Sequence, residues 1–69
     1  ETLEQMELQE RIQYEISRLP DKYRAVIVLK YIEELSLQEI SEILEMPLGT
    51  VKTRIHRGRE ALRKQLANV

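Results

Sequence analysis

The sequence predicts an all-α fold, a four-helix domain that contains a helix-turn-helix. Apolar residues recur every three or four positions along the chain, and no stretch shows the strict alternation of a half-buried strand. Pro20, Ser36 and Pro47 divide this pattern into four segments. The chain has 69 residues and no Cys, Trp or Phe, so its core must be small and aliphatic. We expect residues 1–69 to form a single domain. Because the chain starts at Glu1 rather than at a methionine, we also expect it to be a fragment of a longer protein.

The first two helices are predicted on either side of Pro20. The first runs from about Leu3 to Arg18, with an apolar stripe at Leu8, Ile12, Ile16 and Leu19. The second has Pro20 at its first position and continues through LPDKYRAVIVLKYIEEL. This segment is apolar on several sides and is expected to be the most buried helix. Its β-branched residues also suit a strand, but the helical neighbours and the lack of a second strand argue against one.

The helix-turn-helix is predicted at about 37–66. SLQE is a capping box, in which Ser36 and Glu39 bond each other's backbone amides, so the third helix begins there and ends by Glu45. EMPLGT forms the turn, because Pro47 cannot continue a regular helix, and the fourth helix runs from about Leu48 to Leu66. The core is predicted to consist of Ile12, Ile16, Leu19, Val26, Leu29, Ile40, Leu44, Val51, Ile55 and Leu62.

Charge is divided unequally along the chain. Residues 1–45 carry eleven acidic and five basic side chains, whereas residues 46–69 carry six basic side chains and one acidic side chain. The formal net charge of −1 therefore conceals a basic last helix that is able to face phosphates. On charge alone, a solvated basic helix balanced by acidic neighbours is an equally good interpretation.

The last helix has one apolar and one polar face. At about 100° per residue, its apolar residues form one packing stripe, and Gly58 inside that stripe indicates a close approach of another helix. The exposed residues of its first two turns are suited to the edges of DNA bases: Lys52, Thr53, His56 and Arg57. Arg59, Arg63 and Lys64 suit phosphate or partner contacts more than base reading. Glu60 is expected to pair within the helix, for example with Lys64. His56 and Lys64 are also compatible with simple solvent exposure.

The chain lacks catalytic and metal-binding motifs. It has one His, no HExxH and no glycine-rich phosphate loop. We therefore expect no enzymatic activity, no cofactor and no metal site. No apolar run approaches the roughly 20 residues of a membrane span, so we expect no membrane insertion.

Two motifs, LP..YR and LS..EI..IL..P.GTVK.R..R.R..L, lie between Leu19 and Leu62. Through them, the stretch from Leu19 to Leu66 resembles region four, the C-terminal DNA-binding domain, of bacterial sigma factors of the extracytoplasmic-function group. Within that group it is most similar to the sigma-W-like factors of Bacillus. The resemblance implies binding to the minus-35 promoter element, docking on the flap of the RNA polymerase β subunit, and sequestration by an anti-sigma factor. It also implies a location in the bacterial cytoplasm, at the nucleoid when the protein is in the holoenzyme.

The resemblance also assigns residues. The family's base-reading positions fall on Lys52, Thr53, His56 and Arg57, which the helix geometry indicates independently. Contacts to the DNA backbone are expected at Lys30, Ser36, Leu37, Gln38, Gly49 and Thr50 from the family pattern, and at Arg59 from the helix geometry.

Two residues depart from the family pattern, and two other functions compete with this one. Leu37 stands where many members have Tyr, so a phosphate contact there must use the backbone amide. Glu45 holds a turn position usually taken by Gly, Asn or Asp; if that position needs a positive φ, Glu costs about 1 kcal/mol. The competing functions are the helix-turn-helix effector domain of a response regulator, whose turn consensus differs, and a helical module that binds only other proteins.

Overall fold

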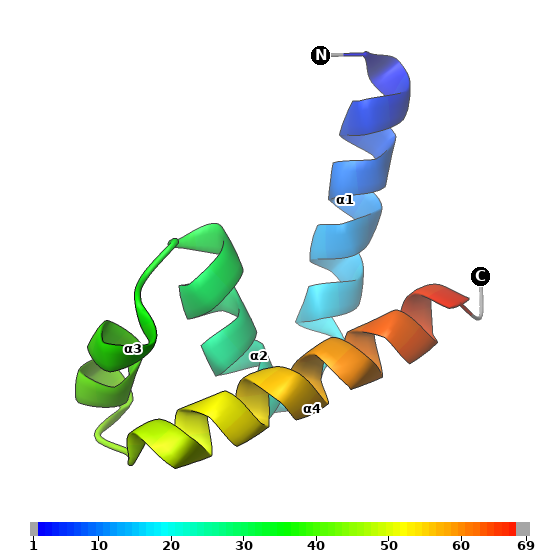
Figure 1. Cartoon of the computed structure of the whole chain (residues 1–69). Helices are drawn as coiled ribbons and strands as arrows, with labels where there is room; N and C mark the ends of the chain where they lie inside the picture. The colour runs from blue at the N-terminus through cyan, green and yellow to red at the C-terminus, as the bar shows by residue number, and fades with distance from the viewer. Residues whose placement is uncertain (1, 68–69) are drawn as a thin grey trace.

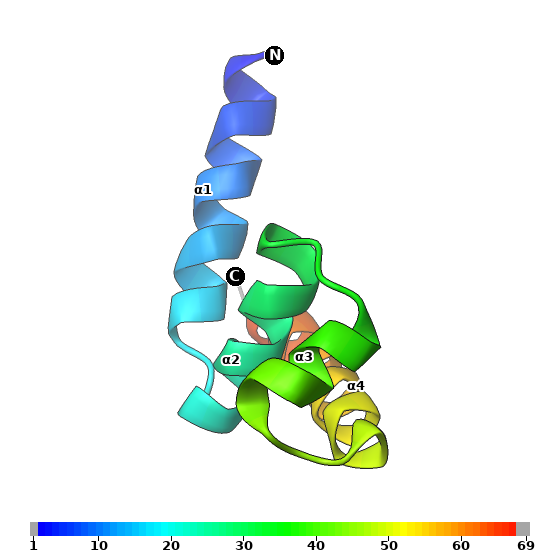
Figure 2. The same ribbon diagram turned by 90° about the vertical axis from the view of Figure 1, so that its left-hand side faces the viewer.

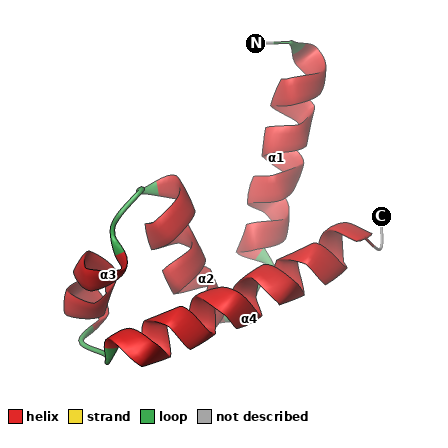
Figure 3. Ribbon diagram, viewed as in Figure 1, coloured by secondary structure: helices red, strands yellow, loops and turns green. Residues whose placement is uncertain are grey.

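The structure is a computed structural model that describes residues 2–67. These residues form no strand and five helical elements: α1 (Leu3–Ser17), α2 (Asp21–Ile27), the π-helical turn η1 (Val28–Ile32), α3 (Leu37–Leu44) and α4 (Leu48–Ala67). Short loops join them (Figure 3). Because η1 continues α2 without a break, the predicted all-α, four-helix fold is confirmed. No helix in this part of the chain is long and apolar enough to cross a membrane.

The longest helix, α4, is the base on which the other helices pack (Figure 1). The α2 helix crosses it, α3 lies beside its first half, and the end of α1 lies near its second half. The first part of α1 projects away from the other helices (Figures 1 and 2), and residues 2–11 are exposed. Leu8, predicted on the buried stripe of this helix, is 55% exposed, because this part of α1 extends past the helices on which its end packs.

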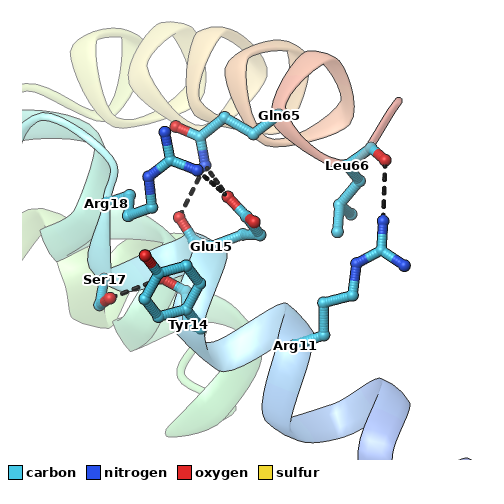
Figure 4. A network of polar contacts seen from close by, with 7 residues as sticks. All are labelled: Arg11, Tyr14, Glu15, Ser17, Arg18, Gln65 and Leu66. Atoms are coloured by element: carbon cyan, nitrogen blue, oxygen red, sulfur yellow. Dashed lines mark hydrogen bonds and ion pairs between the residues drawn. The ribbon is translucent and has the colours of Figure 1, made fainter. Parts of the chain in front are cut away.

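Polar contacts fix the end of α1 against the end of α4 (Figure 4). Glu15 is buried, and its carboxylate accepts a 2.9 Å hydrogen bond from Arg18. Gln65 of α4 donates through Nε2 to the backbone oxygen of Glu15 at 2.8 Å and to its carboxylate at 3.2 Å. One turn earlier on α1, Arg11 donates to the backbone oxygen of Leu66 at 3.1 Å. The buried carboxylate of Glu15 is tolerated here because it accepts hydrogen bonds from Arg18 and Gln65.

The second helix differs from the prediction at both ends. Pro20 is the N-cap, with φ −53° and ψ 146°, and not the first helical residue; α2 therefore begins at Asp21. After Ile27 the backbone widens into the π turn η1, where the amide of Glu33 donates to the oxygen of Val28 at 3.0 Å. The expectation of one regular helix to Leu35 is wrong, because its last turn widens and then ends at Ile32.

The signals around α3 are confirmed. The hydroxyl of Ser36 accepts from the Glu39 amide at 3.1 Å, and the Glu39 carboxylate accepts from the Ser36 amide at 2.9 Å. At the other end, Glu45 has φ 52° and ψ 49°, so the turn does require a left-handed residue. A further hydrogen bond caps the C-terminal end of α3, because the Met46 amide donates to the backbone oxygen of Ser41 at 3.1 Å.

The core lies where α2, α3 and α4 meet the end of α1. All ten residues predicted for the core are buried or packed against it. Ile27 was missed, although it is only 1% exposed. It faces Gly58 of α4: a β-carbon at Gly58 would lie 2.9 Å from Cγ1 of Ile27 and 3.3 Å from Cβ of Tyr23. The close approach of another helix predicted at this glycine is confirmed.

We expect Gly58→Ala to lower the free energy of unfolding by about 1–3 kcal/mol, because the added methyl group overpacks the contact with Ile27. The matched control is Gly49→Ala, at a position of α4 where nothing lies within 4 Å of an added β-carbon. The control is expected to be neutral or stabilising, since Ala favours helix over Gly. Chemical denaturation followed by circular dichroism measures both, and equal effects would contradict the close crossing.

Glu45→Gly should raise the free energy of unfolding by about 1 kcal/mol, because Gly adopts the left-handed conformation without the steric strain of a β-carbon. The control is Glu42→Gly, three residues earlier in the regular part of α3, which should lower stability by about 1 kcal/mol. Denaturant titrations of the two variants should therefore shift in opposite directions. A shift in the same direction would show that the turn at Glu45 is unstrained.

Candidate nucleic-acid interface

The outward face of α4 begins at its first turn. Val51 is fully buried and Ile55 is 7% exposed, so these two residues fix which side of the helix faces the core. The four predicted base-reading side chains are all on the solvent side and exposed: Lys52, Thr53, His56 and Arg57. None of the ion pairs found within residues 2–67 involves them. This face therefore carries polar groups available to an outside partner.

A surface hollow of about 340 Å³ lies beside this face, between the start of α2 and the start of α4. We call it the basic hollow; it is lined by Lys22, Tyr23, Gly49, Thr50, Thr53, Arg54 and Arg57. It brings together two predicted base readers, Thr53 and Arg57, with two predicted backbone contacts, Gly49 and Thr50. Lys52 and His56 are not part of its lining.

Two cations of the basic hollow, Lys22 and Arg54, were missed as site residues. Arg54 follows Thr53 on the basic helix, and its position at the edge of the apolar stripe was the available signal. No signal in the sequence indicated Lys22, because it lies about thirty residues earlier in the chain and comes close to α4 only after α2 has packed across that helix.

The start of α3 holds three more predicted backbone contacts. Ser36 and Gln38 are exposed, whereas Leu37 is half-buried and packs against the core. The Ser36 amide is already bonded to Glu39. The amides of the first helical turn, at Leu37 and Gln38, have no acceptor within the helix and are the donors available to a phosphate here.

Arg59 lies on a different side of α4 from the basic hollow, and Lys30 lines neither that hollow nor the one that Arg59 borders. Lys30 is a half-buried residue of η1, next to Tyr31. Tyr31 and Arg59 line a second hollow, of about 520 Å³, between η1, the end of α1 and the second half of α4. We call it the apolar hollow, because most of its lining consists of Ile12, Ile16, Ile27, Tyr31, Leu62 and Leu66.

The expected pairing of Glu60 within its own helix is confirmed, but the partner is Arg63 and not Lys64. Glu60 instead accepts two hydrogen bonds from Arg63, at 2.8 Å and 3.3 Å, because the forked guanidinium three residues on reaches both carboxylate oxygens. The hydrogen bonds and charge of Arg63 lower the pKa of Glu60, and those of Glu60 raise the pKa of Arg63. The one acidic side chain of the basic helix is thus occupied within α4.

These features define a helix-turn-helix domain with a basic second helix, the class that places this helix in the major groove of DNA. The protein-family model for region 4 of sigma-70 matches residues 9–62, so the chain belongs to the sigma-70 region 4 family. This match confirms the resemblance inferred from the LP..YR and GTVK motifs.

Individual relatives agree with this family. Over 64 residues the chain is 72% identical to the ECF RNA polymerase sigma factor SigW of Bacillus subtilis, which covers 93% of this chain and 34% of that relative. It is 50% identical over 56 residues to the ECF RNA polymerase sigma factor SigE of Mycolicibacterium smegmatis, covering 81% of this chain and 22% of the relative. It is 37% identical over 60 residues to the RNA polymerase sigma-H factor of Pseudomonas aeruginosa, covering 87% and 31%. The chain thus spans about a third of the length of these relatives, or less.

The capping box that fixes the start of α3 should make the stability of the domain depend on pH. Hydrogen bonds from the backbone amide and then the hydroxyl of Ser36 hold the pKa of Glu39 below its ordinary value of 4.5. Because the folded pKa is the lower one, this stabilisation is present above pH 4.5 and is lost as the pH falls through the folded pKa.

We therefore expect the wild type to lose more stability than Glu39→Gln when the pH falls from about 6 to about 3, since the glutamine keeps an acceptor oxygen but does not titrate. Denaturant midpoints at a series of pH values measure this. Parallel curves for the two proteins would mean that the ionised form of Glu39 does not stabilise the start of α3.

Proposed function

We propose that this domain binds the minus-35 element of bacterial promoters as the C-terminal DNA-binding domain of an RNA polymerase sigma factor, and so directs transcription initiation. The observation that carries the proposal is the outward face of α4, where Lys52, Thr53, His56 and Arg57 are exposed beside the buried Val51. The names of the relatives, all RNA polymerase sigma factors, support it.

Each of these side chains suits a base edge. The guanidinium of Arg57 can donate two parallel hydrogen bonds to O6 and N7 of guanine. Thr53 can bond a base or contact the methyl group of thymine, while Lys52 and His56 add donors on the other side of the exposed face. All four lie in the first half of α4, the part of a recognition helix that enters the major groove.

The predicted backbone contacts surround this face. The first-turn amides of α3, at Leu37 and Gln38, and the residues Gly49 and Thr50 at the start of α4 place donors at two helix starts. Lys30 and Arg59 supply positive charge on the η1 side of α4, and Ser36 places its hydroxyl at the start of α3. Contacts of this kind fix the register of a protein on the duplex without reading its sequence.

A partner surface is also proposed. The apolar hollow, with Tyr31 48% exposed and Ile32 beside it 46% exposed, supports docking of an apolar helix or loop. We propose the flap of the RNA polymerase β subunit and an anti-sigma factor as its partners, in the bacterial cytoplasm, and no catalytic role for the domain. The response-regulator alternative has no support beyond the shared helix-turn-helix. A purely protein-binding module would not account for the basic exposed face of α4.

Arg57→Ala and Lys30→Ala should impair promoter binding in different ways. Loss of Arg57 is expected to cost about 1–3 kcal/mol and to relax discrimination at one or two base pairs. Loss of Lys30, on η1 outside the groove, should weaken binding to all sequences alike and lower the slope of log K against log salt by about one unit. Binding titrations of the full-length protein with RNA polymerase, against single-base promoter variants at several salt concentrations, measure both effects.

The two variants are controls for each other. If Arg57→Ala kept the base preference of the wild type and changed only the salt slope, the assignment of the outward face of α4 to the groove would be wrong. If neither the wild type nor the variants distinguished promoter from scrambled DNA, the proposed function itself would fail.

A further inference from the structure

The basic hollow contains more positive charge than the reading of bases requires. Lys22 of α2 and Arg54 of α4 line it together with Arg57, and no acidic side chain is part of its lining. Asp21, the carboxylate next to Lys22 in the chain, is bound by Arg24. Because this neighbouring negative charge is already paired, it does not neutralise Lys22.

The lining of the basic hollow suits an anion, and the hollow opens to solvent at the start of α4. Nζ of Lys22 lies 5.1 Å from the centre of the Tyr23 ring, so a cation–π contact holds the ammonium group at one wall. Arg54 is half-buried on the other wall, near the half-buried Thr50, whose hydroxyl can donate. At Gly49 nothing lies within 4 Å of the place of a β-carbon, which leaves the entrance open at the start of α4.

The position of the hollow relative to α4 selects the ligand. A helix in the major groove has the phosphates of one DNA strand along each of its sides. Arg59 lies on the side of η1 and α1, because it lines the apolar hollow with Tyr31 of η1. Lys30 belongs to the same segment η1, which follows the crossing of α2 over α4. Lys22 and Arg54 lie on the opposite side, between the starts of α2 and α4. With α4 in the major groove, the two sets of cations would therefore face different strands.

We propose that Lys22 and Arg54, assisted by Thr50, bind a backbone phosphate of the DNA strand opposite to the one contacted by Lys30 and Arg59. This inference rests on the proposed function, since it takes α4 to lie in the major groove. The contact adds affinity and fixes the tilt of α4 in the groove, because a helix held at both sides cannot roll about its axis. It reads no base.

The test uses the full-length protein assembled with RNA polymerase and promoter DNA in which single phosphates are replaced, one at a time, by neutral methylphosphonates. Lys22→Gln and Arg54→Gln are the variants, and circular dichroism checks their folding. Lys64→Gln is the matched control, since it removes an exposed cation from the last turn of the same helix, away from the basic hollow.

Each of the two variants should weaken binding by about three- to tenfold and lower the salt slope by about 0.9, with unchanged base preference, whereas Lys64→Gln should behave as wild type. One methylphosphonate should weaken DNA binding by the wild type but not by Lys22→Gln or Arg54→Gln. It should lie on the strand opposite to the one whose methylphosphonate no longer affects binding by Lys30→Ala. Inorganic phosphate should inhibit DNA binding by the wild type no more strongly than DNA binding by Lys22→Gln, because the site binds a phosphate only as part of the duplex.

The outcomes separate the inference from the proposed function. If the wild type prefers the promoter but Lys22→Gln and Arg54→Gln behave like Lys64→Gln, the phosphate site is refuted and promoter recognition stands. The inference is equally refuted if the sensitive phosphate lies on the strand contacted by Lys30, or if inorganic phosphate competes only with the wild type, since the hollow would then bind a free anion. If the wild type itself does not prefer the promoter, both proposals are refuted.

Discussion

The close crossing of α2 over α4 is the constraint on which the rest of the structure depends. Gly58 lets Ile27 and Tyr23 approach the backbone of α4 closely, and Ile27 is almost fully buried at the contact. From this point α2 extends to one side of α4, where Lys22 helps to form the basic hollow. The chain continues through η1 on the other side, where Tyr31 helps to form the apolar hollow. The position of Gly58 thus determines where α2 crosses α4, and so which residues of α2 and η1 lie on each side of α4.

Local signals in the sequence correctly predicted the start and end of α3 and the exposed face of α4. The Ser36–Glu39 capping box needs only residues within one turn, and both of its bonds are present. The exposed side of α4 follows from the spacing of its apolar residues, so Lys52 and Arg57 were placed outward correctly. The left-handed turn at Glu45 was anticipated from the family pattern, although Glu itself gives no preference for that conformation.

What the sequence did not predict depends on contacts between distant residues. The π turn η1 carries no distinct sequence signal, since Val28–Ile32 is as compatible with a regular helix. Lys22 looked like an ordinary solvated residue of α2, because its approach to Arg54 exists only after α2 has packed across α4. Glu60 had two cations within reach on the same helix, and side-chain geometry rather than spacing favoured Arg63.

The arrangement also separates two surfaces along one rigid helix. The first half of α4 carries the exposed polar face and the basic hollow, while its second half borders the apolar hollow and is fixed to α1 by Gln65 and the buried Glu15. Most acidic side chains belong to residues 1–45, including the projecting part of α1. Negative charge on that projecting part repels phosphates from the α1 end of the molecule. Under the proposed function, this repulsion directs DNA to the start of α4.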